Sequence, residues 1–228
     1  MLEGLLLWII TFLFERSMQK ELAFLKIVQN LKMELRHSWL ANYRQESVAE
    51  HSWRLALMAM RYADKLDKPV ELEKCLKLAL IHDLAEFKTG DIPVFHCQGQ
   101  AQRQAKFQAE QQAMLEIKAM LADKQGDDLY DLWLEYEHQL SYESKFIMAL
   151  DKLEVHIQHN EAPLDTWEER EKRMVFQAKW LKRYCQFDSF LERLYQTVNQ
   201  QAINKLIHAG EDIELIKQAA LEEEADWV

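Results

Sequence analysis

Glycine and proline are scarce in this chain of 228 residues, which contains 5 Gly and 3 Pro. All-β folds need many turn residues, so the scarcity argues against that class. Residues that favour helices, such as Leu, Ala, Glu, Gln and Lys, are abundant instead. The composition therefore predicts an all-α protein, and the length suits one domain with a sizeable core.

Cysteine and positive charge are also in short supply. The three cysteines, Cys75, Cys97 and Cys185, are widely spaced and form no Cys-x-x-Cys pair. A disulfide framework or a cysteine zinc site is therefore not expected, and a reducing cytoplasm is the predicted location. The formal net charge of -10 disfavours duplex nucleic acid as a partner, because phosphate backbones bind basic surfaces. A small phosphorylated ligand stays compatible, since it needs only a local pocket.

The chain lacks an apolar run long enough to span a membrane. Its longest run extends from Leu5 to Phe14, whereas a spanning helix needs about 20 apolar residues. Glu3 precedes the run and Glu15-Arg16 follows it, which is not the pattern of a secretory signal. We expect residues 1–17 to form an extra helix on the domain or on a partner, or an extension ahead of a start at Met18. A peripheral membrane anchor is a less favoured alternative.

Helical spacing of apolar residues predicts a succession of helices. Ser47 and Glu50 have the spacing of a capping box and predict a helix start at residue 47. We expect loops over residues 39–46 and 94–104, and no internal repeat or inter-domain linker. The expected helices cover residues 19–36, 47–66, 72–87, 105–122, 129–138, 141–157, 167–184 and 187–208.

Three of these helices carry polar residues where the pattern calls for apolar ones. His51 and Asp151 lie on apolar stripes, and His82-Asp83 interrupts an apolar run one turn before Glu86. Burying imidazoles and carboxylates costs several kcal/mol unless each finds a partner, and a divalent metal suits both. His51, His82, Asp83 and Asp151 could therefore hold a transition ion, with Glu86 placed to accept a proton from a water molecule. Taken singly, His51 is better explained as a satisfied core or surface histidine, and Asp151 could cap a helix or pair with an arginine; the metal site is indicated by the combination, because three separate helices break their apolar pattern in the same way.

The other histidines show no such placement and are interpreted as structural. This group includes His138, His156, His159 and His208. His37 and His96 are expected in loops, where they could flank a pocket.

The order of these motifs resembles that of the HD-domain metal-dependent phosphohydrolases. The wider context is similar to the branch that contains the 5′-deoxynucleotidases. The similarity extends over residues 20–160. It rests on the segments Glu46–His51, His82–Glu86, Gly90–Pro93, Leu129–Glu137, Glu143–Phe146 and Leu150–Glu154.

The resemblance implies a compact HD-domain helical bundle over residues 18–165. The apolar segment 1–17 precedes it, and the C-terminal helices of residues 166–228 pack on the same domain. It implies one divalent metal ion (Mn, Co, Fe, Ni, Zn or Mg) and a homodimer. The metal ligands would be His51, His82, Asp83 and Asp151.

The resemblance also assigns roles around the metal. Glu86 would activate the attacking water, Asp91 would act near the sugar or as a proton source, and Arg36 and Trp39 would contact phosphate and sugar. The chain departs from the family pattern at Ser38, where glycine is usual, and in a spacing from Trp39 to His51 that is two residues short.

The predicted activity is hydrolysis of deoxyribonucleoside 5′-monophosphates to deoxynucleosides and phosphate. Two alternatives within the same superfamily are hydrolysis of a nucleoside triphosphate or of a guanosine pyrophosphate alarmone. These substrates need a larger basic pocket, and the sequence has no cluster of Lys and Arg near the motifs. The remaining alternatives are a metal-binding helical module without catalysis and a helical interaction protein without a metal.

Overall fold

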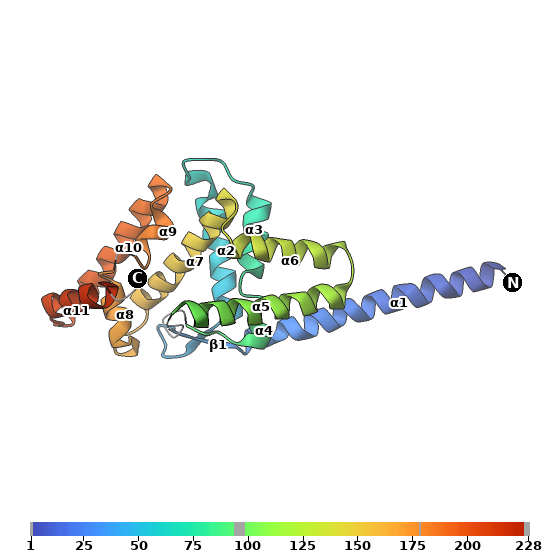
Figure 1. Ribbon diagram of the computed structural model, residues 1–228, viewed down its shortest axis with the longest axis horizontal. Coiled ribbons are helices and arrows are strands. Elements are labelled where there is room, and N and C mark those ends of the chain that lie inside the picture. The colour runs from blue at the N-terminus through green and yellow to red at the C-terminus, as the bar shows by residue number, and fades with distance from the viewer. Residues whose placement is uncertain (1, 94–98, 178, 226–228) are drawn as a thin grey trace.

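The computed structural model describes residues 2–93, 99–177 and 179–225, and most of them are helical (Figure 1). Within these ranges, β1 (Leu35–Trp39) and β2 (Gln45–Ser47) form a small antiparallel pair. The prediction of an all-α fold is confirmed. The helices are α1 (Leu2–Val28), η1 (Gln29–Lys32), α2 (Val48–Tyr62), η2 (Ala63–Lys65), α3 (Leu72–Ile81), α4 (Glu86–Thr89), α5 (Gln100–Leu121), α6 (Lys124–Glu137), α7 (Tyr142–Glu161), η4 (Leu164–Thr166), α8 (Glu169–Met174), α9 (Lys182–Cys185), α10 (Ser189–His208) and α11 (Ile213–Ala225).

Helices α2, α3 and α7 pack against one another at the centre of the molecule. Figure 1 shows the α5–α6 pair on one side of them and helices α8 to α11 on the other. Large buried side chains from the central helices, among them Leu55, Leu78, Phe146 and Leu150, form the main apolar core. A second core cluster forms around Trp133 between α5 and α6. Burial of this apolar area supplies the main stabilisation of the domain.

The hairpin of β1 and β2 corrects the expected helix over 19–36 and the expected loop over 39–46. Helix α1 ends at Val28, and η1 leads into β1. Exposure alternates along β1, but its two buried residues, Arg36 and Ser38, are both polar. A hydrophobic alternation could not reveal this strand, because its inward positions are not hydrophobic.

The expected continuous helix over 72–87 is also wrong. Helix α3 ends at Ile81, and residues 82–85 form a tight turn before α4. In this turn Leu84 N–H donates to Ile81 O, and Glu86 N–H donates to Asp83 O. Adjacent residues of a helix do not face each other. The turn removes that restriction, and Nε2 of His82 lies 3.1 Å from Oδ2 of Asp83.

The expected helix over 167–184 is divided into α8, which ends at Met174, and α9, which begins at Lys182. Two other predicted boundaries hold more closely. The capping box of Ser47 and Glu50 begins α2 as expected, and Ser141 caps α7. Helix α5 begins at Gln100, earlier than expected, and the part of the predicted loop at residues 94–98 lies outside the described residues.

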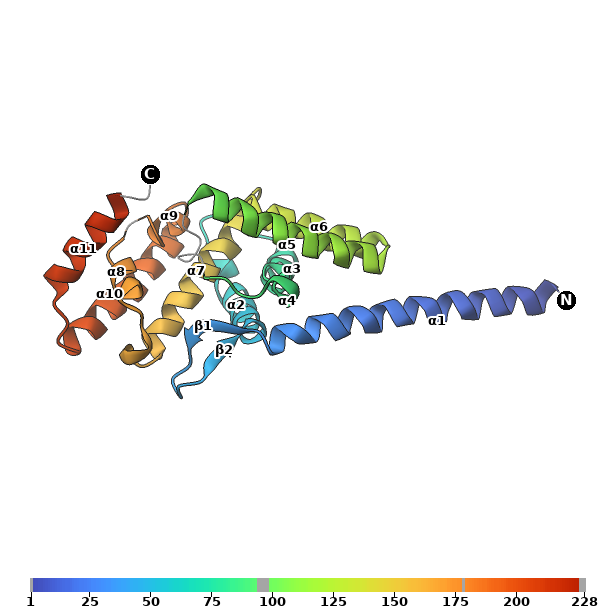
Figure 2. The same cartoon turned by 60° about the horizontal axis from the view of Figure 1, so that its bottom comes forward.

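Helix α1 extends well beyond the rest of the molecule in both views (Figures 1 and 2). Several of its large apolar side chains are exposed, including Trp8, Ile10 and Phe14. Among the described residues, no helix is long and apolar enough to cross a membrane. The helix continues through the boundary expected at residue 17, so the division into 1–17, 18–165 and 166–228 stays a prediction.

Candidate functional site

Helix α2 and the tight turn after α3 bring His51, His82 and Asp83 together. Nε2 of His51 lies 3.3 Å from Nε2 of His82, and Nε2 of His82 lies 3.1 Å from Oδ2 of Asp83. Metal bonds of about 2.0–2.2 Å place neighbouring ligand atoms about 3.0–3.5 Å apart. The ligand atoms of the three residues all lie within 4.8 Å of one another. Their spacing therefore suits a shared divalent cation.

Asp151 of α7 joins this set through His51. Its Oδ1 lies 3.3 Å from Nε2 of His51. Its Oδ2 accepts hydrogen bonds from the hydroxyl of Tyr136, at 2.7 Å, and from Nζ of Lys152, at 2.8 Å. One oxygen of Asp151 is thus held by protein donors, while the other faces the imidazole.

The second nitrogen of each imidazole has a protein partner. Nδ1 of His51 lies 2.5 Å from Oε2 of Glu154, and Nδ1 of His82 lies 3.0 Å from the carbonyl oxygen of Ala79. A donor at Nδ1 leaves the lone pair of the ring on Nε2, where a metal would bind. The donor set and its outer partners therefore fit a metal centre.

The electrostatic surroundings also favour a positive charge here. Burial and Arg36 oppose protonation of His51, but Glu154 and Asp151 outweigh them and raise its pKa to about 10. Burial acts to raise the pKa of Asp83, yet His82 and Arg36 hold it below its usual value. The site thus stabilises anionic carboxylates beside a cation, which a divalent metal would supply.

Glu86, in the first turn of α4, is buried close to this set. Burial, and then the negative charges of Asp83 and Asp91, raise its pKa well above the usual value. Its Oε2 has no hydrogen-bond partner among the described residues, and the same holds for Oδ2 of Asp91. Such a carboxylate is a strong base at the edge of a polar cavity.

Asp91 follows a glycine turn that ends α4. Gly90 has a φ of 73°, a left-handed conformation that favours glycine, and Asp91 N–H donates to Oε1 of Glu34. Glu86 and Asp91 both line one cavity.

Arg36 lies within hydrogen-bonding distance of the metal-ligand candidates, whereas Trp39 does not. Nη1 of Arg36 lies 3.1 Å from Oδ2 of Asp83, and its Nε lies 3.6 Å from Oε2 of Glu46. Trp39 is half-buried on the same strand, and its carbonyl oxygen accepts a hydrogen bond from Gln158. It is absent from the described residues that line the cavity, so its substrate role stays a prediction.

The cavity has a volume of about 270 Å³, which is the scale of a small-molecule site. It is lined by His82, Asp83 and Asp151, and by basic side chains that the motifs did not indicate. Arg103 and Lys106 reach it from α5. Sequence spacing could not place them there, because they are brought in by the packing of α5 on α4.

Sequence reasoning missed Glu154 and misinterpreted two histidines. Glu154 is three residues after Asp151 on α7 and fully buried, so its position on the same helical face was the available indication. His37 lies on β1 rather than in a loop, although it does line the cavity, as expected of a residue that could flank a pocket; His159, interpreted as structural, lines the cavity too. The expectation for His96 lies outside the described residues.

Comparison with known proteins places this geometry in a family. A family model described as an HD domain matches residues 28–190. The chain is 40% identical over 157 residues to the 5′-deoxynucleotidase HDDC2 of Xenopus laevis, which covers 67% of this chain and 71% of that protein. It is 38% identical over 143 residues to the 5′-deoxynucleotidase HDDC2 of Homo sapiens, covering 61% and 67%.

A solved structure supports the fold. The structure of a predicted metal-dependent phosphohydrolase from Magnetospirillum magnetotacticum MS-1 aligns with a TM-score of 0.69 and 24% identity, covering 83% of this chain and 97% of that one. Residues 28–190, which the family model matches, contain helix α2, the tight turn after α3 and helix α7, which together carry the candidate ligands. The chain belongs to the HD domain family.

Proposed function

We propose that this metal-dependent phosphohydrolase hydrolyses deoxyribonucleoside 5′-monophosphates to deoxynucleosides and inorganic phosphate. The observation that carries the proposal is the convergence of His51, His82 and Asp83 beside the buried carboxylate of Glu86. The relatives at 38–40% identity are named as 5′-deoxynucleotidases, which supports this substrate class.

We assign the metal ligands to His51, His82, Asp83 and Asp151. A bound divalent cation supplies charge neutralisation for a phosphate oxygen and lowers the pKa of a water. Glu154 and the carbonyl oxygen of Ala79 orient the two imidazoles for this role.

The protein side chains perform the remaining steps. Glu86 accepts a proton from the attacking water, a task for which its raised pKa makes it a better base. Arg36 binds the phosphate and offsets charge that develops during transfer. Asp91, when protonated, gives a proton to the departing sugar oxygen.

The decisive experiment measures phosphate release from a panel of nucleotides. The protein is stripped with a chelator and reloaded with one metal at a time. The panel contains the ribo- and deoxyribonucleoside 5′-mono-, di- and triphosphates and a 3′-monophosphate. We expect turnover of the deoxyribonucleoside 5′-monophosphates that depends on added metal.

An Asp83→Ala variant is the control for this experiment and should lose both metal and activity. Turnover restricted to triphosphates would overturn the proposed substrate, and an active, metal-free Asp83→Ala variant would overturn the proposed site.

We also propose that the enzyme is a cytoplasmic homodimer. The exposed apolar side chains of α1 support association between copies of the chain. Light scattering on the purified protein tests the homodimer. We expect twice the mass of one chain, and a monomeric mass at micromolar concentration would contradict the homodimer.

A further inference from the structure

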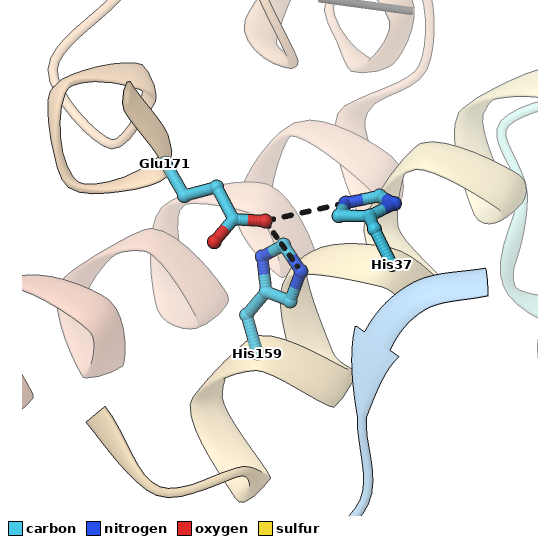
Figure 3. Close-up of side chains that lie close together, drawn as sticks. All are labelled: His37, His159 and Glu171. Atoms are coloured by element: carbon cyan, nitrogen blue, oxygen red, sulfur yellow. Dashed lines mark ion pairs between the residues drawn. The ribbon is translucent and has the colours of Figure 1, made fainter. Parts of the chain in front are cut away.

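A second group of potential ligands lies outside the set described above. His37 comes from β1, His159 from the last turn of α7, and Glu171 from α8. Figure 3 shows both imidazoles pointing at one carboxylate oxygen. Nε2 of His37 and Nε2 of His159 each lie 3.2 Å from Oε1 of Glu171.

These separations lie at the long end of the hydrogen-bond range, about 2.7–3.2 Å, and are longer than another imidazole–carboxylate contact in the same protein. Nδ1 of His51 lies 2.5 Å from Oε2 of Glu154, and charge-assisted hydrogen bonds generally measure about 2.7–2.9 Å. The 3.2 Å separations instead match the 3.1–3.3 Å separations within the His51, His82 and Asp83 set. They also match the edge of a coordination polyhedron with bonds of about 2.1 Å.

The fold fixes the direction of each donor. Oε2 of Glu171 accepts a hydrogen bond from Glu168 N–H at 2.6 Å, which leaves Oε1 for the two imidazoles. His159 lies at the C-terminal end of α7, where the helix dipole favours a positive charge.

All three residues line the same cavity as His82, Asp83 and Asp151, but the two groups share no residue. Two imidazoles and one carboxylate are a common ligand set for divalent transition ions, and they leave positions open for water or another ligand. We propose that His37, His159 and Glu171 form a second divalent transition-metal site, with its open face toward the cavity.

Zinc stoichiometry tests the second site without reference to catalysis. Full-length protein is stripped with a chelator, loaded with Zn²⁺, desalted and analysed by elemental mass spectrometry. We expect two zinc ions per chain in the wild type and one in Glu171→Gln. Asp83→Ala should also retain one, and the double variant should retain none.

Glu169→Gln is the matched control, because Glu169 is an exposed carboxylate of the same helix whose ion pair is with Lys172. This variant should keep two zinc ions. Circular dichroism checks the fold of each variant. Should Glu171→Gln fail to fold, His37→Gln removes a different ligand and should also retain one zinc.

The outcomes separate the two sites. A single zinc that is lost in Asp83→Ala and kept in Glu171→Gln overturns the second site, and the His37–Glu171–His159 contact is then a hydrogen-bonded cluster. A single zinc that is lost in Glu171→Gln and kept in Asp83→Ala supports the second site and contradicts the ligand set of the proposed function.

Discussion

Nδ1 of His51 lies 2.5 Å from Oε2 of Glu154, and neither side chain is exposed to solvent. The contact joins α2 to α7 and directs the opposite ring nitrogen toward His82 and Asp83. Arg54 binds the other oxygen of Glu154 at 2.6 Å, so the carboxylate is held on both sides. A carboxylate in this position increases the basicity of a ligating imidazole.

Glu154→Gln should therefore weaken metal binding. The amide oxygen can still accept from Nδ1 of His51, but its negative charge is gone, and we expect the dissociation constant to rise about 10–100-fold. Competition with a fluorescent chelator measures this change. Glu161→Gln is the matched control, because Glu161 also binds Arg54 but is exposed. Equal metal affinity in Glu154→Gln and wild type would contradict the role of Glu154.

Glu86→Gln should separate metal binding from turnover. Glutamine keeps the shape of the side chain but cannot accept a proton, so kcat should fall by about 10²–10⁴-fold. Metal content should match the wild type, because Glu86 is outside the proposed ligand set. Glu110→Gln provides a control carboxylate that lines the same cavity and is paired with Lys106. Wild-type kcat in Glu86→Gln would assign activation of the water to another group.

Arg36→Lys should weaken binding of the phosphate more than binding of the nucleoside. Lysine keeps the charge but loses the planar guanidinium that reaches both Asp83 and Glu46. We expect KM for a deoxyribonucleoside 5′-monophosphate to rise roughly tenfold, as for the loss of one charged hydrogen bond. The inhibition constant of the product deoxynucleoside should be unchanged. A parallel loss of affinity for the nucleoside would point to a general distortion of the cavity instead.

Stability should decline in mild acid because of His156. This ring is buried on α7, and burial followed by the charge of His159 lowers its pKa to about 4. An unfolded histidine binds a proton near pH 6.5, so the unfolded chain takes up protons first as the pH falls. The free energy of unfolding should therefore decrease between pH 6.5 and 4, by an amount on the order of 2–3 kcal/mol for this group.

Thermal unfolding of His156→Gln across this pH range provides the test. The Tm of the variant should fall less than that of the wild type on acidification. Identical pH profiles for wild type and His156→Gln would show that this ring does not carry the acid sensitivity.

The sequence permits prediction of those parts of the site in which a single helix breaks its own pattern. His51 and Asp151 interrupt apolar stripes, so they could be recognised without knowledge of tertiary structure. The tight turn at residues 82–85 was not apparent, because its leucine and alanine residues continue the apolar run of α3. The position of His82-Asp83 at the end of a helix, rather than within it, depends on hydrogen bonds that local pattern does not report.

Contacts between segments that are distant in the chain could not be predicted from the sequence. Glu171 meets His37 and His159 only because α8 folds back beside β1 and the end of α7. The hairpin could not be predicted for a related reason. Its inward residues, Arg36 and Ser38, are polar, and they are buried only because other elements pack around them. Fold class could be predicted because it depends on composition, which is a property of the whole chain.

The wall of the cavity has a consequence for shortened forms of the protein. Glu171, Met174, Trp180 and Tyr184 all line the cavity, although each follows residue 165, the expected end of the core. A chain cut at that position would keep every predicted ligand from His51 to Asp151 while exposing them to bulk water. The motifs alone therefore do not define the smallest active fragment. That fragment must extend at least through Tyr184.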